Sequence, residues 1–337
     1  MNATRIITLI LSTVYLNFTN AQTKSIFDLM NHSEVLNMTL EADFSALKEN
    51  RRTDDSHKGK LTFEDADAVS QNWNIKIKLR GKFRRLNCEM PPLKLDFKKG
   101  DLEEKGLADF DDLKLVTQCT DDKNEAKAFL MKEYLTYKMY NELTDYSYRV
   151  QLVRITYKDT STGKKSKEWA FLIEDTAQLA ARLKAEKVSA FTTSPREFSS
   201  TSVKQATLFQ YIIGNADWEL STGRNIKLFL KDGILIPVPY DFDFSGLVNA
   251  SYAIPNADYD LSSIKERVIP QLPKQYHDLH GTIYYFVGKK EKLFDVIQNF
   301  KYLSRTDRTE MVDYLNTYFV NADNLRFVER KSLTTAP

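Results

Sequence analysis

The stretch 211–246 constrains the fold of this chain more than any other, because its order of apolar and polar residues fits a single hairpin. Two apolar runs, 226–230 and 234–238, stand on either side of the turn 231–233, which ends in Gly. A strand, a tight turn and a returning strand account for this order. Whatever stands just before the first run and just after the second therefore meets at one end of a β-ribbon.

Oxygen-bearing side chains gather at that end of the expected hairpin. Asn225 stands before the first run, Asp241 follows the second, and Asp217 lies on the preceding loop. Hard divalent cations such as Mg²⁺ or Mn²⁺ prefer oxygen ligands and often share them with substrate phosphates. An acidic pair directly after an apolar strand is costly unless it is paired or metal-bound, so Asp243 is a further candidate. The sequence predicts a phosphate-handling site with Asn225, Asp241 and Asp243 on Mg²⁺ or Mn²⁺.

Asp217 and Asn225 also have ordinary explanations. Asp217 could organise its own loop as an Asx-turn residue. Asn225 could be a turn amide that begins a strand. The prediction of a site rests on the three positions taken together.

Bulk composition describes an ordinary globular chain. It has 337 residues, 42% hydrophobic and 28% charged, with a formal net charge of +2. This length suits one large domain or two smaller ones. A charge so close to zero gives no general attraction to nucleic acid, so no nucleic-acid partner is expected.

The N-terminus resembles a targeting segment. Arg5 is followed by a mostly apolar run, 6–16, and then by small residues suited to cleavage after Ala21. This pattern predicts a signal peptide over 1–21 and an exported protein that is secreted, periplasmic or at the cell surface. A buried N-terminal helix or strand is the alternative. The run is too short to span a bilayer and no similar run follows, so we expect no transmembrane segment.

The two cysteines, Cys88 and Cys119, permit one disulfide in an exported protein. Two unrelated free thiols are the alternative. Their spacing excludes a Cys-x-x-Cys zinc or redox motif.

Hydrophobic periodicity divides the chain into a β-rich part over 22–175 and a helical part over 176–337. The best helix pattern is 121–143, which contains neither Gly nor Pro. Further helices are expected at 176–187, at 198–213 and, two or three in number, from 289 onward. Strand patterns occur at 35–44, 57–63, 73–79, 93–97, 113–116, 148–157 and 168–173.

This layout resembles the CotH group of atypical kinases, with a looser likeness to HipA-type kinases. The likeness covers about 75–246 and is carried by 79–82, 91–95, the helix around Glu133, 171–174, 215–217, 225–228 and 237–243. No Gly-rich loop occurs, and Asp241 is followed by Phe-Asp rather than Phe-Gly. The resemblance implies an α+β, bilobal protein-kinase-like fold, with a β-rich N-lobe, one long helix and a mainly helical C-lobe.

The resemblance also implies roles for individual residues. Asp217 would act as the catalytic residue on the acceptor hydroxyl. A lysine would contact the phosphates, and Lys94 is the candidate, with Lys114 as its rival. Glu133 would hold that lysine, with Glu125 as the alternative.

Two further residues are expected at the nucleotide. Glu174 lies in the segment 173–175, whose backbone would bind the base. Arg80 belongs to the basic segment 80–84, which would cover the phosphates. ATP or another nucleotide would be the donor.

Three hypotheses of function follow. The first is an exported CotH-like kinase that transfers phosphate to an unknown protein or small-molecule acceptor. The alternative is a catalytically silent ligand-binding or structural protein of the cell envelope. A third is a two-metal hydrolase that uses Asp217, Asp241 and Asp243.

Overall fold

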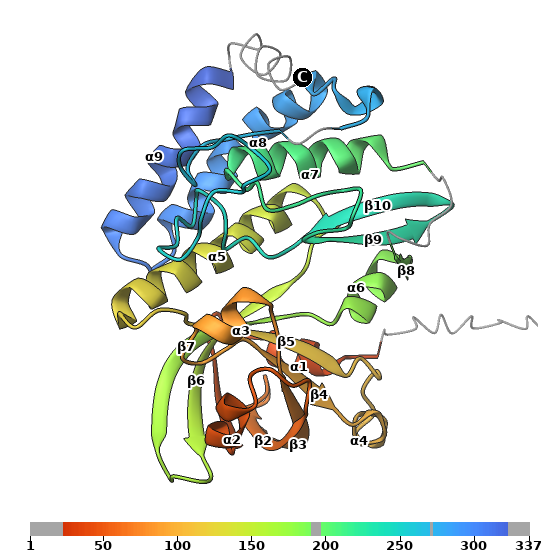
Figure 1. Ribbon diagram of the computed structural model, residues 1–337. Helices are drawn as coiled ribbons and strands as arrows, with labels where there is room; N and C mark the ends of the chain where they lie inside the picture. Colours follow the sequence, from red (N-terminus) through yellow and green to blue (C-terminus); the bar gives the residue numbers. More distant parts are fainter. Residues whose placement is uncertain (1–22, 190–196, 270–271, 323–337) are drawn as a thin grey trace, which may run out of the picture.

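The computed structural model describes residues 23–189, 197–269 and 272–322. The expected signal peptide, 1–21, lies outside these ranges. The described chain is mixed α+β, with a strand-rich part and a helix-rich part stacked on each other (Figure 1).

Seven strands form a closed barrel in the order β1-β2-β3-β4-β5-β7-β6. Neighbouring strands are antiparallel except for one pair, since β1 runs parallel to β6 from Leu36 opposite Val153 to Ala42 opposite Asp159. The strands are β1 (Leu36–Ala42), β2 (His57–Glu64), β3 (Ser70–Leu79), β4 (Leu93–Phe97), β5 (Asp112–Thr117), β6 (Val150–Asp159) and β7 (Lys165–Ile173).

Closure of this barrel contradicts the predicted fold class. A bilobal protein-kinase-like fold was expected, and that prediction is wrong, because β1 pairs with β2 on one edge and with β6 on the other. The alternating residues that predicted each strand do not state which strands become neighbours. The pairing of β1 with β6 joins strands more than one hundred residues apart, and it removes both sheet edges.

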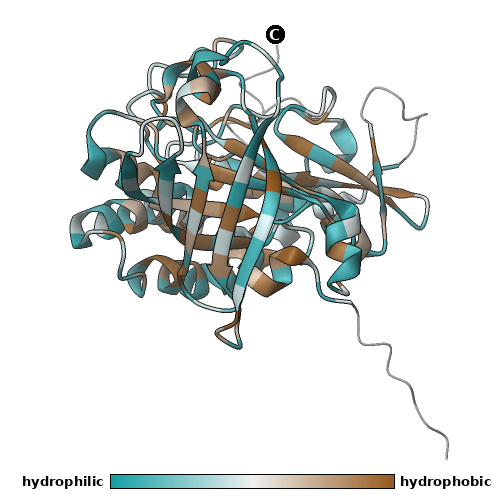
Figure 2. Ribbon diagram, turned by 90° about the horizontal axis from the view of Figure 1, so that it is seen from below, coloured by the Kyte–Doolittle hydropathy of each residue, from teal (hydrophilic) through white to brown (hydrophobic). Residues whose placement is uncertain are grey.

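The barrel interior is an apolar core built from alternating residues. Along β3, Trp73, Ile75 and Ile77 are buried while the residues between them are exposed. The same alternation appears as bands of colour along the barrel strands in Figure 2. Burial of one face of each strand is what holds the register, because a slip by one residue would turn the apolar face to water.

A second core lies around α5 (Lys123–Leu143), which packs against β6, β7 and α8. In Figure 1, α5 lies between the barrel and the other long helices. The residues of this core come from both sides of position 175. The other long helices are α7 (Ser200–Ile212), α8 (His280–Gln298) and α9 (Arg305–Ala322).

The predicted hairpin is present and belongs to a small sheet of order β10-β9-β8. Its strands are β8 (Glu186–Val188), β9 (Ile226–Lys231) and β10 (Ile234–Pro239). The shorter helices are α1 (Ile26–Met30), α2 (Phe44–Glu49), α3 (Phe83–Asn87), α4 (Lys99–Glu104), α6 (Thr176–Leu183) and the 3-10 turn η1 (Lys274–Tyr276).

Cys88 and Cys119 are joined in a disulfide, with their Cα atoms 4.7 Å apart. This bond ties the end of α3 to the segment between β5 and α5. Within 23–189, 197–269 and 272–322, the helices lack the combined length and apolarity needed to cross a bilayer.

Candidate functional site

A cleft of about 700 Å³ lies where the hairpin faces the connection between β3 and β4. Asp217, Asn225 and Asp241 line it on the hairpin side. Arg80 and Lys82 line it on the barrel side. The cleft therefore has oxygen ligands together with Arg224 on the hairpin side, and cations on the barrel side.

Hairpin geometry brings Asn225 and Asp241 to the same end of the ribbon. Pro239 pairs with Ile226, and the Tyr240 N–H donates to the Asn225 carbonyl across 3.0 Å. Both Asn225 and Asp241 have left-handed backbones, with φ of 52° and 66°. Non-glycine residues adopt this conformation at a cost, and such positions cluster at functional sites.

Two hydrogen bonds to Asp217 fix the side chain of Asn225. Its amide Nδ2 donates to the Asp217 carbonyl at 2.7 Å and to the Asp217 carboxylate at 2.9 Å. Both amide hydrogens are thereby used, so the amide oxygen is the atom that Asn225 can offer a cation. Burial raises the pKa of Asp217, the nearby Arg224 guanidinium opposes this, and the Asp241 carboxylate adds to it.

Asp241 is held by its backbone, which leaves its carboxylate available. Its N–H donates to the Tyr137 hydroxyl of α5 across 2.8 Å. The side chain is half-buried and accepts no hydrogen bond from the described part of the chain. Because the backbone of Asp241 is held in place and its carboxylate oxygens accept no such hydrogen bond, this carboxylate is suited to bind a cation.

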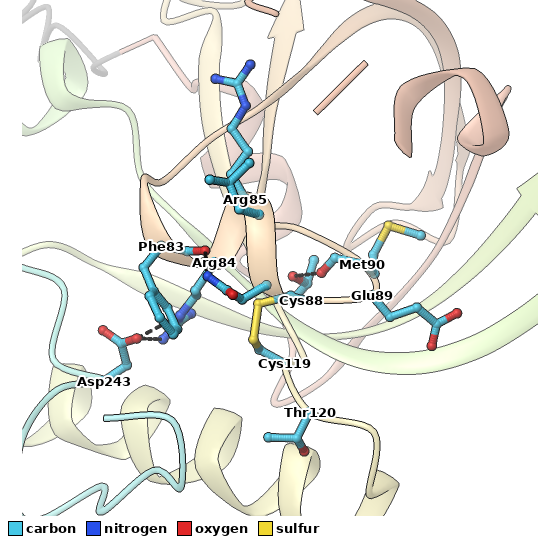
Figure 3. The surroundings of a disulfide bond; sticks show 12 residues. Phe83, Arg84, Arg85, Cys88, Glu89, Met90, Cys119, Thr120 and Asp243 are labelled. Atoms are coloured by element: carbon cyan, nitrogen blue, oxygen red, sulfur yellow. Dashed lines mark hydrogen bonds and ion pairs between the residues drawn. A yellow bond between two sulfur atoms is a disulfide. The ribbon is translucent and has the colours of Figure 1, made fainter. Parts of the chain in front are cut away.

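A buried cluster of charge lies beside Asp241. Arg84 of α3 donates from Nε to Asp243 at 2.8 Å and from Nη2 to Glu133 at 2.6 Å. Figure 3 shows Arg84 turned toward Asp243 while Arg85 points away from it. One guanidinium therefore joins the barrel side of the cleft to α5 and to the end of the hairpin.

The carboxylates of Glu133, Asp241 and Asp243 come close enough to share an ion. They offer oxygens that all lie within 4.8 Å of one another. Burial raises the pKa of Glu133 to about 8, and that of Asp243 to about 6, while Arg84 works in the opposite direction. Glu133 also keeps one buried oxygen, Oε1, without a hydrogen-bond partner among the described residues.

Three residues that were predicted to bind the nucleotide, Arg80, Lys94 and Glu174, lie in different surroundings from one another. Arg80 lines the cleft. Lys94 lies on the outer face of β4 and pairs with Asp112 at 2.6 Å. Glu174 is buried, and its carboxylate binds Arg149 and Arg182.

The rival lysine, Lys114, lies close to the cleft. Its ammonium is 5.7 Å from the centre of the Tyr240 ring and 4.9 Å from that of Tyr148. Burial lowers the pKa of Lys114 to about 7, and repulsion from Arg80 adds to this. Glu125, the alternative to Glu133, instead accepts a hydrogen bond from Ser251 at 3.1 Å.

Sequence patterns gave no role to Tyr137 or Arg224. Tyr137 fell among the core residues of the long helix, and nothing in its spacing indicated that its hydroxyl meets the hairpin. Arg224 directly precedes Asn225, and its Nε lies 3.7 Å from Asp217. Its position next to Asn225 in the sequence is the signal that could have placed this arginine at the site.

Neither the protein-family models nor the curated proteins contain a match to this chain.

Proposed function

We propose that this cleft binds ATP or another nucleotide together with Mg²⁺ or Mn²⁺ and transfers a phosphoryl group to a hydroxyl of a protein or small molecule. The observation that carries this proposal is that oxygen ligands and cations face each other across the cleft. Asp217, Asn225 and Asp241 line one side, and Arg80 and Lys82 line the other. Phosphoryl transfer needs positioning, a cation and neutralisation of phosphate charge, and little else from a protein.

The cations are available for phosphate. Within the described ranges, the cleft residues Arg80 and Lys82 have no carboxylate within ion-pair distance. Lys114, close to the cleft, has none either, and its ammonium donates to the Thr176 hydroxyl across 3.1 Å. Unpaired cations in a partly enclosed cleft attract anions more strongly than they would in open water. A volume of about 700 Å³ is within the range of small-molecule sites.

Asp217 is the residue proposed to accept the proton. Its carboxylate is partly exposed, its raised pKa favours proton uptake, and Asn225 fixes its orientation. The acceptor oxygen bonds to the terminal phosphorus of the nucleotide as the bond from that phosphorus to the leaving nucleoside diphosphate breaks. The hydroxyl proton passes to Asp217. The divalent cation, held through Asp241, supplies charge neutralisation at the phosphates.

We further propose that the chain is a divergent relative of the CotH group and that it is exported. The motif residues 215–217, 225–228 and 237–243 support the first proposal. The disulfide between Cys88 and Cys119 supports the second, because such bonds persist in oxidising compartments.

Transfer of label from γ-labelled ATP tests the proposed activity. With Mg²⁺ or Mn²⁺ present, the protein should label itself or an added protein mixture, and Asp217→Asn should lose at least about 100-fold of the rate. Asp260→Asn, a change at an exposed carboxylate, is the matched control. Nucleotide binding without label transfer would instead favour the catalytically silent alternative. Hydrolysis of a phosphoester without any nucleotide would favour the two-metal hydrolase.

A further inference from the structure

One carboxylate oxygen of Glu133 is buried in the protein interior without a hydrogen-bond partner among the described residues. The residue is 1% exposed, and its Oε1 has no hydrogen-bond donor among the described residues. Its other oxygen, Oε2, is 2.6 Å from Arg84. A buried acceptor without a partner costs about 1–3 kcal/mol and more when it is charged, so a native protein normally provides one.

With all three carboxylates ionised, as ligation of a cation requires, the charges around that oxygen do not balance. Glu133, Asp241 and Asp243 contribute three carboxylates, and Arg84 is the one cation bound to the two buried members. Ionised, the cluster has a formal charge of minus two. A divalent cation would bring that charge to zero, which one monovalent cation could not do.

The geometry can accommodate such an ion. Oxygens of the three carboxylates lie within 4.8 Å of one another, as oxygens on a common ion do. Asp241 and Asp243 line the cleft, so an ion has a path from solvent. Asp241 is held at its root by Tyr137, and Glu133 lies one helical turn before Tyr137 on α5.

We propose that Glu133, Asp241 and Asp243 form a divalent-cation site, with Arg84 as a fixed cation that compensates the remaining charge. This inference deepens the proposed function, since it names the ligands of the cation on which that function rests. It also changes the expected role of Glu133, which becomes a metal ligand rather than the partner of a lysine. Mg²⁺ and Mn²⁺ are the ions that suit an all-oxygen ligand set completed by water or phosphate.

Binding of Mn²⁺ alone tests this site without any nucleotide. The oxidised full chain, stripped with a chelator, is titrated with MnCl₂, and free Mn²⁺ is followed by electron paramagnetic resonance. We expect Mn²⁺ to bind to the wild type, and its affinity to fall at least about tenfold in Glu133→Gln and in Asp241→Asn. Glu142→Gln, an exposed change on the same helix, is the matched control and should leave the affinity unchanged.

Asp241→Asn keeps the proposal testable if Glu133→Gln fails to fold, because Asp241 takes no part in the Arg84 ion pairs. Equal Mn²⁺ affinity in the wild type and a folded Glu133→Gln would overturn the proposal. Absence of Mn²⁺ binding to the folded wild type would do the same.

The two proposals fail in different ways. Glu133-dependent Mn²⁺ binding in a protein that binds no nucleotide would support this site and refute phosphoryl transfer. Label transfer from ATP that survives in Glu133→Gln, with unchanged Mn²⁺ affinity, would support the activity and refute the site.

Discussion

Arg84 and Asp243 are 159 residues apart in the sequence, yet Nε of Arg84 donates to the Asp243 carboxylate across 2.8 Å in the interior of the protein. The same guanidinium reaches Glu133 on α5. Three separate elements thus meet at one buried charge: α3, the long helix and the segment after β10. The two walls of the cleft are held together there, which makes the cluster a structural element as well as a candidate site.

Removal of Arg84 should therefore destabilise the protein strongly. Arg84→Met leaves two buried carboxylates without their cation, and we expect the free energy of unfolding at neutral pH to fall by about 3–5 kcal/mol. Urea denaturation in the presence of a chelator measures this free energy of unfolding. Arg52→Met, a change at an exposed arginine, is the matched control and should cost about 0.5 kcal/mol or less. Similar losses in the two variants would show that the buried cluster does not hold the walls together.

Stability should also depend on pH through the same cluster. Burial raises the pKa of Glu133 from 4.5 to about 8 and that of Asp243 from 3.8 to about 6. Between the unfolded and folded values, the folded protein binds more protons than the unfolded chain, so its stability falls as pH rises. We expect a loss of at least about 1 kcal/mol between pH 5 and pH 8 without divalent cations.

Glu133→Gln isolates this effect, because glutamine does not titrate. The slope of unfolding free energy against pH should flatten in the variant, measured by urea denaturation at pH 5, 6.5 and 8. An unchanged slope would mean that other groups govern the pH dependence.

Nucleotide affinity should depend on pH through Lys114. Burial holds the pKa of this ammonium at about 7, and a bound phosphate would raise it again. Binding above pH 7 then takes up a proton, so affinity should fall by about tenfold between pH 7 and pH 8.5. Calorimetry in two buffers of different ionisation enthalpy measures the proton directly. Lys114→Met should abolish the uptake, and Lys94→Met, on the neighbouring strand, should leave it unchanged.

The disulfide should contribute to stability by closing the chain between residues 31 positions apart. For a loop of that size, its removal in Cys88→Ala/Cys119→Ala is expected to cost about 4 kcal/mol. Because Cys88 lies four residues after Arg84, the same change should weaken Mn²⁺ binding at the cluster. A double variant that unfolds at the same urea concentration as the wild type would exclude this contribution.

Local structure was largely predictable from the sequence. The helix pattern over 121–143 corresponds to α5, and the runs 226–230 and 234–238 correspond to β9 and β10. The positions of Asn225 and Asp241 at one end of the hairpin followed from the turn between those strands. These features depend on residues close together in the chain, where periodicity and turn chemistry are informative.

Features that depend on distant residues were not predictable in this way. The parallel pairing of β1 with β6 closes the barrel, and neither strand carries a local sign of its partner. Arg84 belongs to the basic segment that was expected to cover the phosphates. In the structure it lies in the short helix α3, next to the disulfide, and its guanidinium binds two buried carboxylates. Lys94 and Lys114 both occupy positions where an alternating strand normally exposes a lysine, and they lie opposite each other on β4 and β5. The packing of Lys114 against Tyr240, which the sequence does not indicate, distinguishes it from Lys94.

Thermal unfolding with and without ATP and Mg²⁺ tests the central claim most directly, which is that the cleft binds a nucleotide through a divalent cation at Asp241. At roughly ten times the dissociation constant, we predict that ATP with Mg²⁺ raises the Tm by about 3 °C. Neither Asp241→Asn nor wild type with ATP and chelator should show the shift. Asp232→Asn, at the opposite end of the same hairpin, should keep it in full. An unchanged Tm in the wild type, or an equal shift in Asp241→Asn, would contradict the claim.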